Sequence, residues 1–186
     1  MRKIFMLAML ATLAGCTSDK SDATKTESMN SDSAKSENRI TDTLTYPYTP
    51  QYSNKFAIGD ANNSLIVLQL YQDWDNNTIE NSKNRFADSV IMVFSDGTRL
   101  SGTRDSVLNF VKKVRSTIGS ITSDLTAWMP LRSTDKNEDW VAVWFTEHRV
   151  SPAGKKDSSF YQETWRLNKD GKVDRFYQYE EKVPKK

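Results

Sequence analysis

The stretch WVAVWFTEHRVSPAGKKDSSFYQETWRLNKDGKVDRFYQYEE, residues 140–181, decides the fold of this chain. It holds three segments rich in aromatic and β-branched residues, which favour β-strands: residues 140–150, 159–167 and 172–181. The segments SPAGKKD (151–157) and NKDG (168–171) separate them, and residues of these types form turns. The pattern predicts an antiparallel meander, one face of which other parts of the chain must cover.

A fourth strand of this sheet is predicted just before the meander, over residues 121–132. Its apolar side chains fall on alternate positions, which is the period of a β-strand. They are Ile121, Leu125, Ala127, Met129 and Leu131. The charged segment 133–139 then connects this strand to the meander.

The earlier part of the chain predicts helices that can cover the sheet. Residues 65–75 carry Val67, Leu70, Tyr71 and Trp74 at helical spacing, and a second, shorter helix is expected over residues 79–86. A strand over residues 90–94 and a turn at Asp96-Gly97 follow.

A third helix is predicted to open at GTRD (102–105) and to end at Gly119. Its apolar side chains form one stripe: Val107, Phe110, Val111, Val114 and Ile118. The order helix, helix, strand, helix and four antiparallel strands predicts an α+β fold with helices on one face of a curved sheet.

The N-terminal segment begins with MRK (1–3), continues with an apolar run over residues 4–14 and ends in LAGC (13–16). The run is shorter than the ~20 residues that span a bilayer, and the pattern is typical of a signal peptide. The LAGC motif is similar to the lipobox of bacterial lipoproteins. That resemblance implies a signal peptide over residues 1–15, cleavage before Cys16, and acylation of Cys16 with fatty acids such as palmitate. An ordinary secretory signal followed by an unrelated cysteine is the alternative.

Acyl chains on Cys16 would make membrane lipid the first partner of this protein. Thr17 stands where lipoproteins of enteric-type bacteria carry an aspartate if they stay in the inner membrane. The resemblance therefore implies the bacterial cell envelope and favours the outer membrane.

Residues 16–54 are predicted to form a disordered tether. They are mostly small polar and charged residues, which cannot bury enough surface to offset the entropy of ordering. A spacer is the favoured interpretation, and a recognition tail is the alternative. The segment YPYTPQY (46–52) differs, and we expect it to pack as an extended arm along the edge of the domain.

The composition gives no indication of a nucleic-acid, metal or cofactor site. The 186 residues carry a net charge of only +2, whereas a nucleic-acid partner calls for a concentrated basic face. Cys16 is the only cysteine and His148 the only histidine, so neither an internal disulfide nor a tight zinc site is expected.

The elements and their turns resemble the nuclear-transport-factor-2-like superfamily, which includes SnoaL-like polyketide cyclases and ketosteroid isomerases. The resemblance rests on FADS (86–89) before a strand, Asp96-Gly97, GTRD (102–105) before a helix, and the closing DGKV (170–173) hairpin. It implies that residues 55–183 form a cone, in which a strongly bent antiparallel sheet wraps around about three N-terminal helices and leaves a pocket.

The resemblance also implies which side chains line that pocket. A hairpin centred near Ala153 and Gly154 places Trp144 opposite Glu163, with Thr146 and His148 on the same face. The expected pocket residues are Trp74, Phe94, Trp144, Thr146, His148, Tyr161, Glu163, Trp165, Phe176 and Gln178, with Glu180 beyond them. Several aromatics and a carboxylate suit a flat, apolar ligand with a polar end.

This chain lacks part of the catalytic residue set of the ketosteroid isomerases that it resembles. Ketosteroid isomerases use a carboxylate base at the position that corresponds to Phe94, which cannot accept a proton. Glu163 keeps an acidic group where those enzymes have a second acid, and its aromatic surroundings should raise its pKa. An enzyme would therefore depend on Glu163 and on His148. Glu147 lies on the other face of the strand, so Glu147 and His148 do not form an acid–base pair.

The leading hypothesis is therefore a membrane-anchored accessory domain that binds a small apolar ligand or forms a homodimer through its sheet. The alternative is a cofactor-free lyase, isomerase or cyclase acting on a small apolar substrate. A structural envelope protein with a filled cone is a third interpretation.

Overall fold

The computed structural model describes residues 45–182. The predicted signal peptide, Cys16 and most of the predicted tether lie outside these residues. The elements, in chain order, are β1 (Phe56–Ile58), α1 (Ala61–Asp75), the 3₁₀ helix η1 (Ile79–Arg85), β2 (Phe86–Val93), β3 (Arg99–Thr103), α2 (Arg104–Ser116), β4 (Ser120–Ser133), β5 (Glu138–Val150), β6 (Lys156–Leu167) and β7 (Val173–Lys182).

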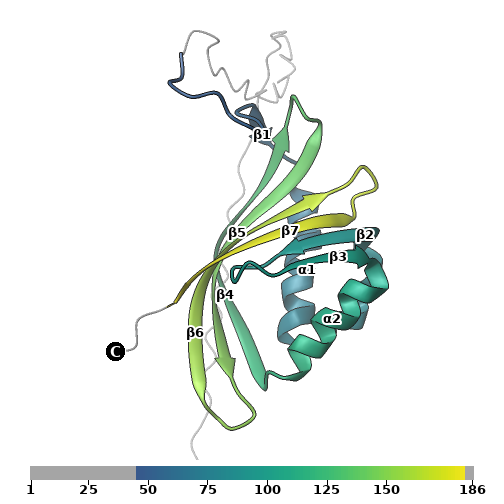
Figure 1. Cartoon of the computed structure of the whole chain (residues 1–186), viewed down its shortest axis with the longest axis vertical. Coiled ribbons are helices and arrows are strands. Elements are labelled where there is room, and N and C mark those ends of the chain that lie inside the picture. Colours follow the sequence, from purple (N-terminus) through teal and green to yellow (C-terminus); the bar gives the residue numbers. More distant parts are fainter. Residues whose placement is uncertain (1–44, 183–186) are drawn as a thin grey trace, which may run out of the picture. The chain divides into compact units, whose positions relative to one another are not determined.

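All the strands belong to one sheet, in the order β1-β4-β5-β6-β7-β2-β3. Figure 1 shows the long strands β4 to β7 bending along their length, with α1 and α2 together on the concave side. The α+β prediction, with helices on one face of a curved sheet, is confirmed. One detail differs, because β2 pairs parallel with β7 and the sheet is therefore mixed rather than antiparallel throughout.

The core lies between this concave face and the helices. Val67 of α1 and Val107 of α2 are fully buried, as are Val141 and Val143 of β5. Both α-helices begin at a side-chain cap: Asp60 accepts a hydrogen bond from the backbone N–H of Asn62, at 2.8 Å, and Thr103 accepts one from the backbone N–H of Ser106. The apolar stripe predicted for α1 points into the core, whereas in the stripe predicted for α2 Val107 is buried but Phe110 and Val114 are each 39% exposed.

Two short strands, β1 and β3, were not predicted from the sequence. β1 has three residues and pairs with the end of β4, whereas β3 has the sequence RLSGT, in which alternation is weak. β2 begins at Phe86 rather than at residue 90, and the segment before it is a 3₁₀ helix. The Asp96-Gly97 turn is present, with Gly97 at a φ of +85°, and it joins β2 to β3.

The β5–β6 hairpin differs from its predicted register by one residue. Trp144 lies opposite Gln162, and Val143 lies opposite Glu163. The loop between Val150 and Lys156 has five residues and is closed by a hydrogen bond from Gly154 N to Ser151 O, with Gly154 at a φ of +77°. A shift of one residue turns every side chain of a strand to the opposite face.

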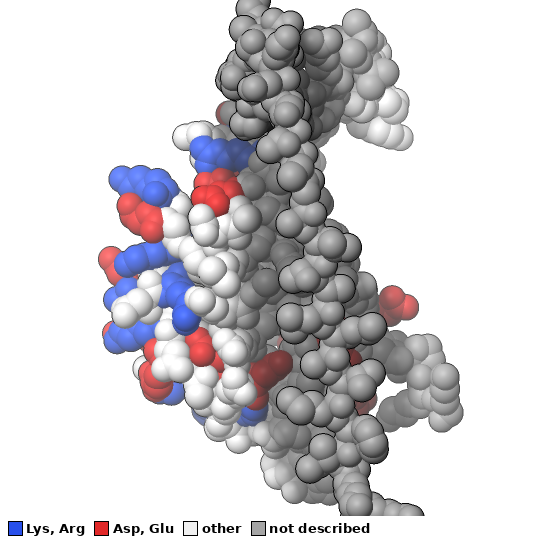
Figure 2. All heavy atoms as spheres, turned by 180° about the vertical axis from the view of Figure 1, so that it is seen from behind, with Lys and Arg blue, Asp and Glu red and all other residues white. Residues whose placement is uncertain are grey.

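Charged side chains of both signs alternate on the helical side of the domain (Figure 2). Lys83 pairs with Asp105 at 3.0 Å, and Lys112 pairs with Glu80. Within residues 45–182, no helix is long and apolar enough to cross a bilayer.

The start of the described chain contacts the sheet, because Tyr52 accepts a hydrogen bond from the Trp140 indole at 3.1 Å.

Candidate functional site

A cavity of about 230 Å³ lies between the two helices and the concave face of the sheet. Its wall is mostly apolar. α1 contributes Leu70, α2 contributes Val111, and the sheet contributes Phe145, Trp165 and Phe176. The three aromatic side chains of the sheet are buried, so they form a buried aromatic wall of the cavity.

The structure brings seven of the ten predicted pocket residues together around this cavity. They are Trp74, Phe94, Tyr161, Glu163, Trp165, Phe176 and Gln178. Those on β6 and β7 alternate along their strands, as the resemblance implied.

The other three predicted residues, Trp144, Thr146 and His148, do not line the cavity, and their prediction was wrong. Because the hairpin register is shifted by one residue, they point away from the helices. His148 contacts Ser158 at 2.7 Å and Asp124 at 3.1 Å on that outer side. A catalytic role of His148 in the cavity is therefore excluded by its position.

The same shift brings Phe145, Glu147 and Arg149 into the cavity wall. The sequence interpretation correctly placed Glu147 and His148 on opposite faces, but assigned the cavity to the wrong one. Tyr71 also lines the cavity, although it was not among the predicted pocket residues. Its place in the apolar stripe of residues 65–75 was the signal that could have identified it.

Three polar side chains and one indole form a buried cluster in this apolar cavity. Tyr71 donates a hydrogen bond to Oε2 of Glu163, and the amide of Gln178 donates to Oε1 of Glu163 at 2.8 Å. The indole of Trp165 donates to the Tyr71 hydroxyl at 3.1 Å. The cluster joins α1, β6 and β7, so the fold itself positions the carboxyl group.

Burial controls the protonation of this cluster. Removal from water raises the pKa of Glu163 to about 7, although the hydrogen bonds from Tyr71 and Gln178 act in the opposite direction. Burial, followed by the charge of Glu163, raises the pKa of Tyr71 well above its usual value. Glu163 is therefore a carboxyl group that exchanges a proton near neutral pH while Tyr71 stays protonated.

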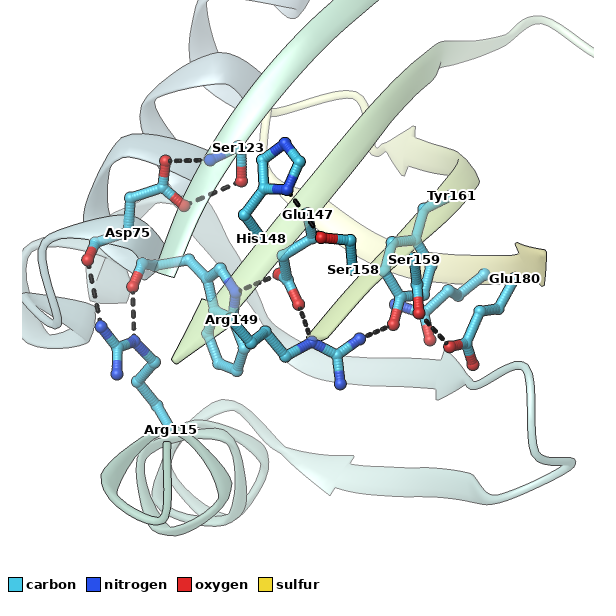
Figure 3. Close-up of polar contacts among 12 residues, drawn as sticks. Asp75, Arg115, Ser123, Glu147, His148, Arg149, Ser158, Ser159, Tyr161 and Glu180 are labelled. Atoms are coloured by element: carbon cyan, nitrogen blue, oxygen red, sulfur yellow. Dashed lines mark hydrogen bonds and ion pairs between the residues drawn. The ribbon is translucent and has the colours of Figure 1, made fainter. Parts of the chain in front are cut away.

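A second polar group lies on the same cavity wall, around Glu147 (Figure 3). The indole of Trp74 donates to Oε2 of Glu147 at 2.7 Å, and Nε of Arg149 donates to Oε1 at 2.5 Å. The guanidinium group also donates to the hydroxyl of Tyr161, and it lies 5.5 Å from the centre of that ring. In Figure 3, Arg149 bridges Glu147 on its own strand and Tyr161 on the next.

Arg115 supports this wall from α2. It is only 2% exposed, and it donates to the carbonyl oxygen of Trp74 at 2.7 Å and to that of Asp75 at 3.0 Å (Figure 3). A cation at the carbonyl end of a helix is favourable, and here it also satisfies carbonyls that the helix leaves unpaired. Arg115 thereby holds the end of α1, and with it Trp74, against the sheet.

The cavity can therefore surround a ring-sized apolar group, and Glu163 can give or take a proton inside it. Arg149 and Tyr161 offer donors at a second point of the wall. Among the described residues, no three His, Cys, Asp or Glu side chains come together in a way that could hold a metal ion.

No protein-family model and no curated protein matches this sequence. Solved structures do match its fold. A nuclear-transport-factor-2-like protein of unknown function from Exiguobacterium sp. 255-15 is 17% identical, with a TM-score of 0.53 over 63% of this chain and 99% of that chain.

Two further structures carry functional descriptions. A SnoaL-like polyketide cyclase, so described, from Shewanella denitrificans OS-217 is 8% identical, with a TM-score of 0.54 over 66% of this chain and 92% of that chain. An LEH-like epoxide hydrolase from M. tuberculosis is also 8% identical, with a TM-score of 0.54 over 64% and 82%. At these identities the likeness is one of fold. The described domain has the nuclear-transport-factor-2-like fold, to which SnoaL-like proteins also belong.

Proposed function

We propose that this protein is a cell-envelope lipoprotein whose domain binds a small, mainly apolar ligand in the cavity. The observation that carries the proposal is the aromatic cavity with the buried cluster of Tyr71, Glu163 and Gln178 at its wall. Apolar pockets with a few convergent polar groups are the usual form of small-molecule sites. Burying a carboxyl group is costly even when it is paired, and a buried carboxyl group with a perturbed pKa in a cavity is a candidate functional group.

The size of the cavity limits the ligand. A protein cavity of roughly 150 Å³ holds benzene, so about 230 Å³ accommodates one ring with a short substituent. The aromatic side chains Phe145 and Phe176 would contact the ring. The polar groups of the wall would contact the substituent.

The test is native mass spectrometry of the full-length chain, purified gently from its own host, with a variant that fills the cavity. Val111→Phe adds a ring to the cavity wall, whereas Thr146→Phe adds the same ring on the outer face of β5. We expect a small molecule to co-purify with the wild type and with Thr146→Phe, but not with Val111→Phe. An apo mass for the wild type, together with no binding of indole or of other one-ring compounds, would refute the ligand proposal.

The lipoprotein part of the proposal rests on the LAGC (13–16) motif. Acylated Cys16 would hold the domain at the membrane through its tether, with the outer membrane favoured. Cys16→Ser should release the protein into the soluble fraction and abolish labelling with a radioactive fatty acid. Continued membrane association of Cys16→Ser would contradict the anchor.

A second candidate function is cofactor-free acid–base catalysis on the bound molecule, as in a lyase, isomerase or cyclase. The pKa of Glu163, about 7, favours this candidate because a general base works best near the ambient pH. The descriptions of similar folds as polyketide cyclase and epoxide hydrolase agree with it. Turnover of the co-purifying molecule that is lost in Glu163→Gln would establish it, and turnover that survives the change would exclude Glu163 as the base.

We also propose that the outer face of the sheet mediates homodimer formation. Tyr179 lies opposite Gln162, which lies opposite Trp144, so it is on the outer face. It is 61% exposed, and aromatic side chains are enriched at protein interfaces. Sedimentation of Tyr179→Ser against the wild type tests this. A monomeric wild type at micromolar concentration would reject the dimer.

A further inference from the structure

Two hydrogen-bond donors of the cavity wall, one on Arg149 and one on Tyr161, have no acceptor among the described residues. Arg149 uses Nε for Glu147 and Nη2 for the Tyr161 hydroxyl. Within residues 45–181, no group accepts a hydrogen bond from Nη1 of Arg149 or from the hydroxyl proton of Tyr161. Arginine has only donors, and the tyrosine hydroxyl has a proton of its own to donate.

These two donors are at least partly shielded from water. Tyr161 is 4% exposed, the side chain of Arg149 is 30% exposed, and both line the cavity. Because the Arg149 side chain is partly exposed, water can reach its unpaired donor, and a ligand in the cavity can replace that water. In Figure 3 the guanidinium and the Tyr161 hydroxyl meet between adjacent strands, so the two donors converge on the same region.

The carboxylate oxygens of the cavity, in contrast, each already accept one hydrogen bond from the protein. The two oxygens of Glu147 accept from Trp74 and Arg149. The two oxygens of Glu163 accept from Gln178 and from Tyr71. An amine would therefore have to share each carboxylate oxygen with a protein donor, whereas a ligand acceptor would meet donors that have no protein partner.

We propose that Arg149 and Tyr161 bind a carboxylate group of the ligand, which makes the ligand class a small carboxylic acid with one ring-sized apolar body. The inference rests on the proposed ligand-binding function. A carboxylate has two oxygens and no donor, so it can accept from Nη1 of Arg149 and from the Tyr161 hydroxyl together. Glu147, held by Trp74, fixes the orientation of the guanidinium group.

The test compares three compounds that differ in one polar group: phenylacetate, phenylacetamide and phenethylamine. Their affinities for the detergent-solubilised full-length chain are measured by calorimetry and by fluorescence of the cavity tryptophans. The variants are Arg149→Gln and Tyr161→Phe, with Lys113→Gln as a control that removes a positive charge from the exposed face of α2. Tyr161→Phe removes only one hydroxyl group, so it stands as the decisive variant if Arg149→Gln does not fold.

We expect phenylacetate to bind the wild type and Lys113→Gln about tenfold more tightly than phenylacetamide, the effect of one charge-assisted hydrogen bond. Tyr161→Phe and Arg149→Gln should remove this preference while phenylacetamide affinity stays within about twofold. Equal affinities in the wild type, tighter binding of phenethylamine, or a preference that survives Tyr161→Phe would overturn the inference. If these compounds fail but indole binds, only the carboxylate inference falls. If indole also fails, the proposed ligand function falls with it.

Discussion

Tyr71 on α1 donates a hydrogen bond to the carboxyl group of Glu163 on β6, although 92 residues separate them in the chain. The contact lies inside an apolar cavity, and it attaches the first helix to the concave face of the sheet. It also explains why a carboxyl group can remain there: the phenol, with Gln178, replaces part of the hydration that burial removes. The same pair connects the stability of the domain to pH.

Glu163→Gln should make stability less dependent on pH. The pKa of Glu163 is about 7 in the folded protein, against 4.5 in the unfolded chain, so the folded state binds this proton more tightly. Its stabilising contribution is complete below pH 4.5 and is lost as the pH rises through about 7. This loss is roughly 3 kcal/mol. Urea denaturation at pH 5 and pH 8 measures it, with Glu181→Gln at the exposed end of β7 as the control. Equal pH dependence in wild type and Glu163→Gln would refute the assignment.

Tyr71→Phe should raise the pKa of Glu163 further. The phenol stabilises the ionised carboxylate through its hydrogen bond, and phenylalanine keeps the ring but provides no donor. Titration of a ¹³C-labelled glutamate carboxyl group by NMR reports this pKa directly. Tyr161→Phe is the matched control, because Tyr161 neighbours Glu163 on β6 but donates no hydrogen bond to it. A pKa that falls or stays constant in Tyr71→Phe would show that the phenol is not an effective donor.

Neighbouring positions on β5 should respond very differently to truncation. Phe145 is 2% exposed and faces the helices, so Phe145→Ala should lower the free energy of unfolding by about 3–5 kcal/mol. Thr146 faces the outer side, and Thr146→Ala should change it by less than about 1 kcal/mol. Denaturant unfolding of both variants gives the comparison. The reverse order of effects would mean that the register places Thr146 inside.

Arg115→Met should destabilise the domain by about 3 kcal/mol, because it leaves several buried carbonyl oxygens without donors. These are the carbonyls of Trp74 and Asp75 at the end of α1 and that of Ile118 after α2. Lys113→Met, on the exposed side of α2, is the control and should have little effect. Thermal and urea unfolding measure both. If the two variants lose the same stability, Arg115 does not join the helix ends as described.

Local patterns in the sequence predicted much of this architecture. The alternation in residues 140–181 identified β5, β6 and β7, and the apolar stripe from Val107 to Ile118 identified α2. β3 and β1 were missed because short edge strands need little apolar alternation; their hydrogen bonds come from neighbours that are distant in the chain. The parallel pairing of β2 with β7 was missed because the two strands are far apart in the chain, and no local pattern in the sequence indicates such a pairing.

The sequence by itself determined the helices, the long strands and the cavity-facing side of β6, where Tyr161, Glu163 and Trp165 alternate. Only the tertiary structure decided which face of β5 completes the wall, and hence that Glu147 and Arg149, rather than His148, lie in the cavity. The physical reason is that alternation shows that a strand has two faces, whereas the hairpin loop sets their register. A register shift of one residue in the β5–β6 hairpin therefore changed which side chains of β5 line the cavity.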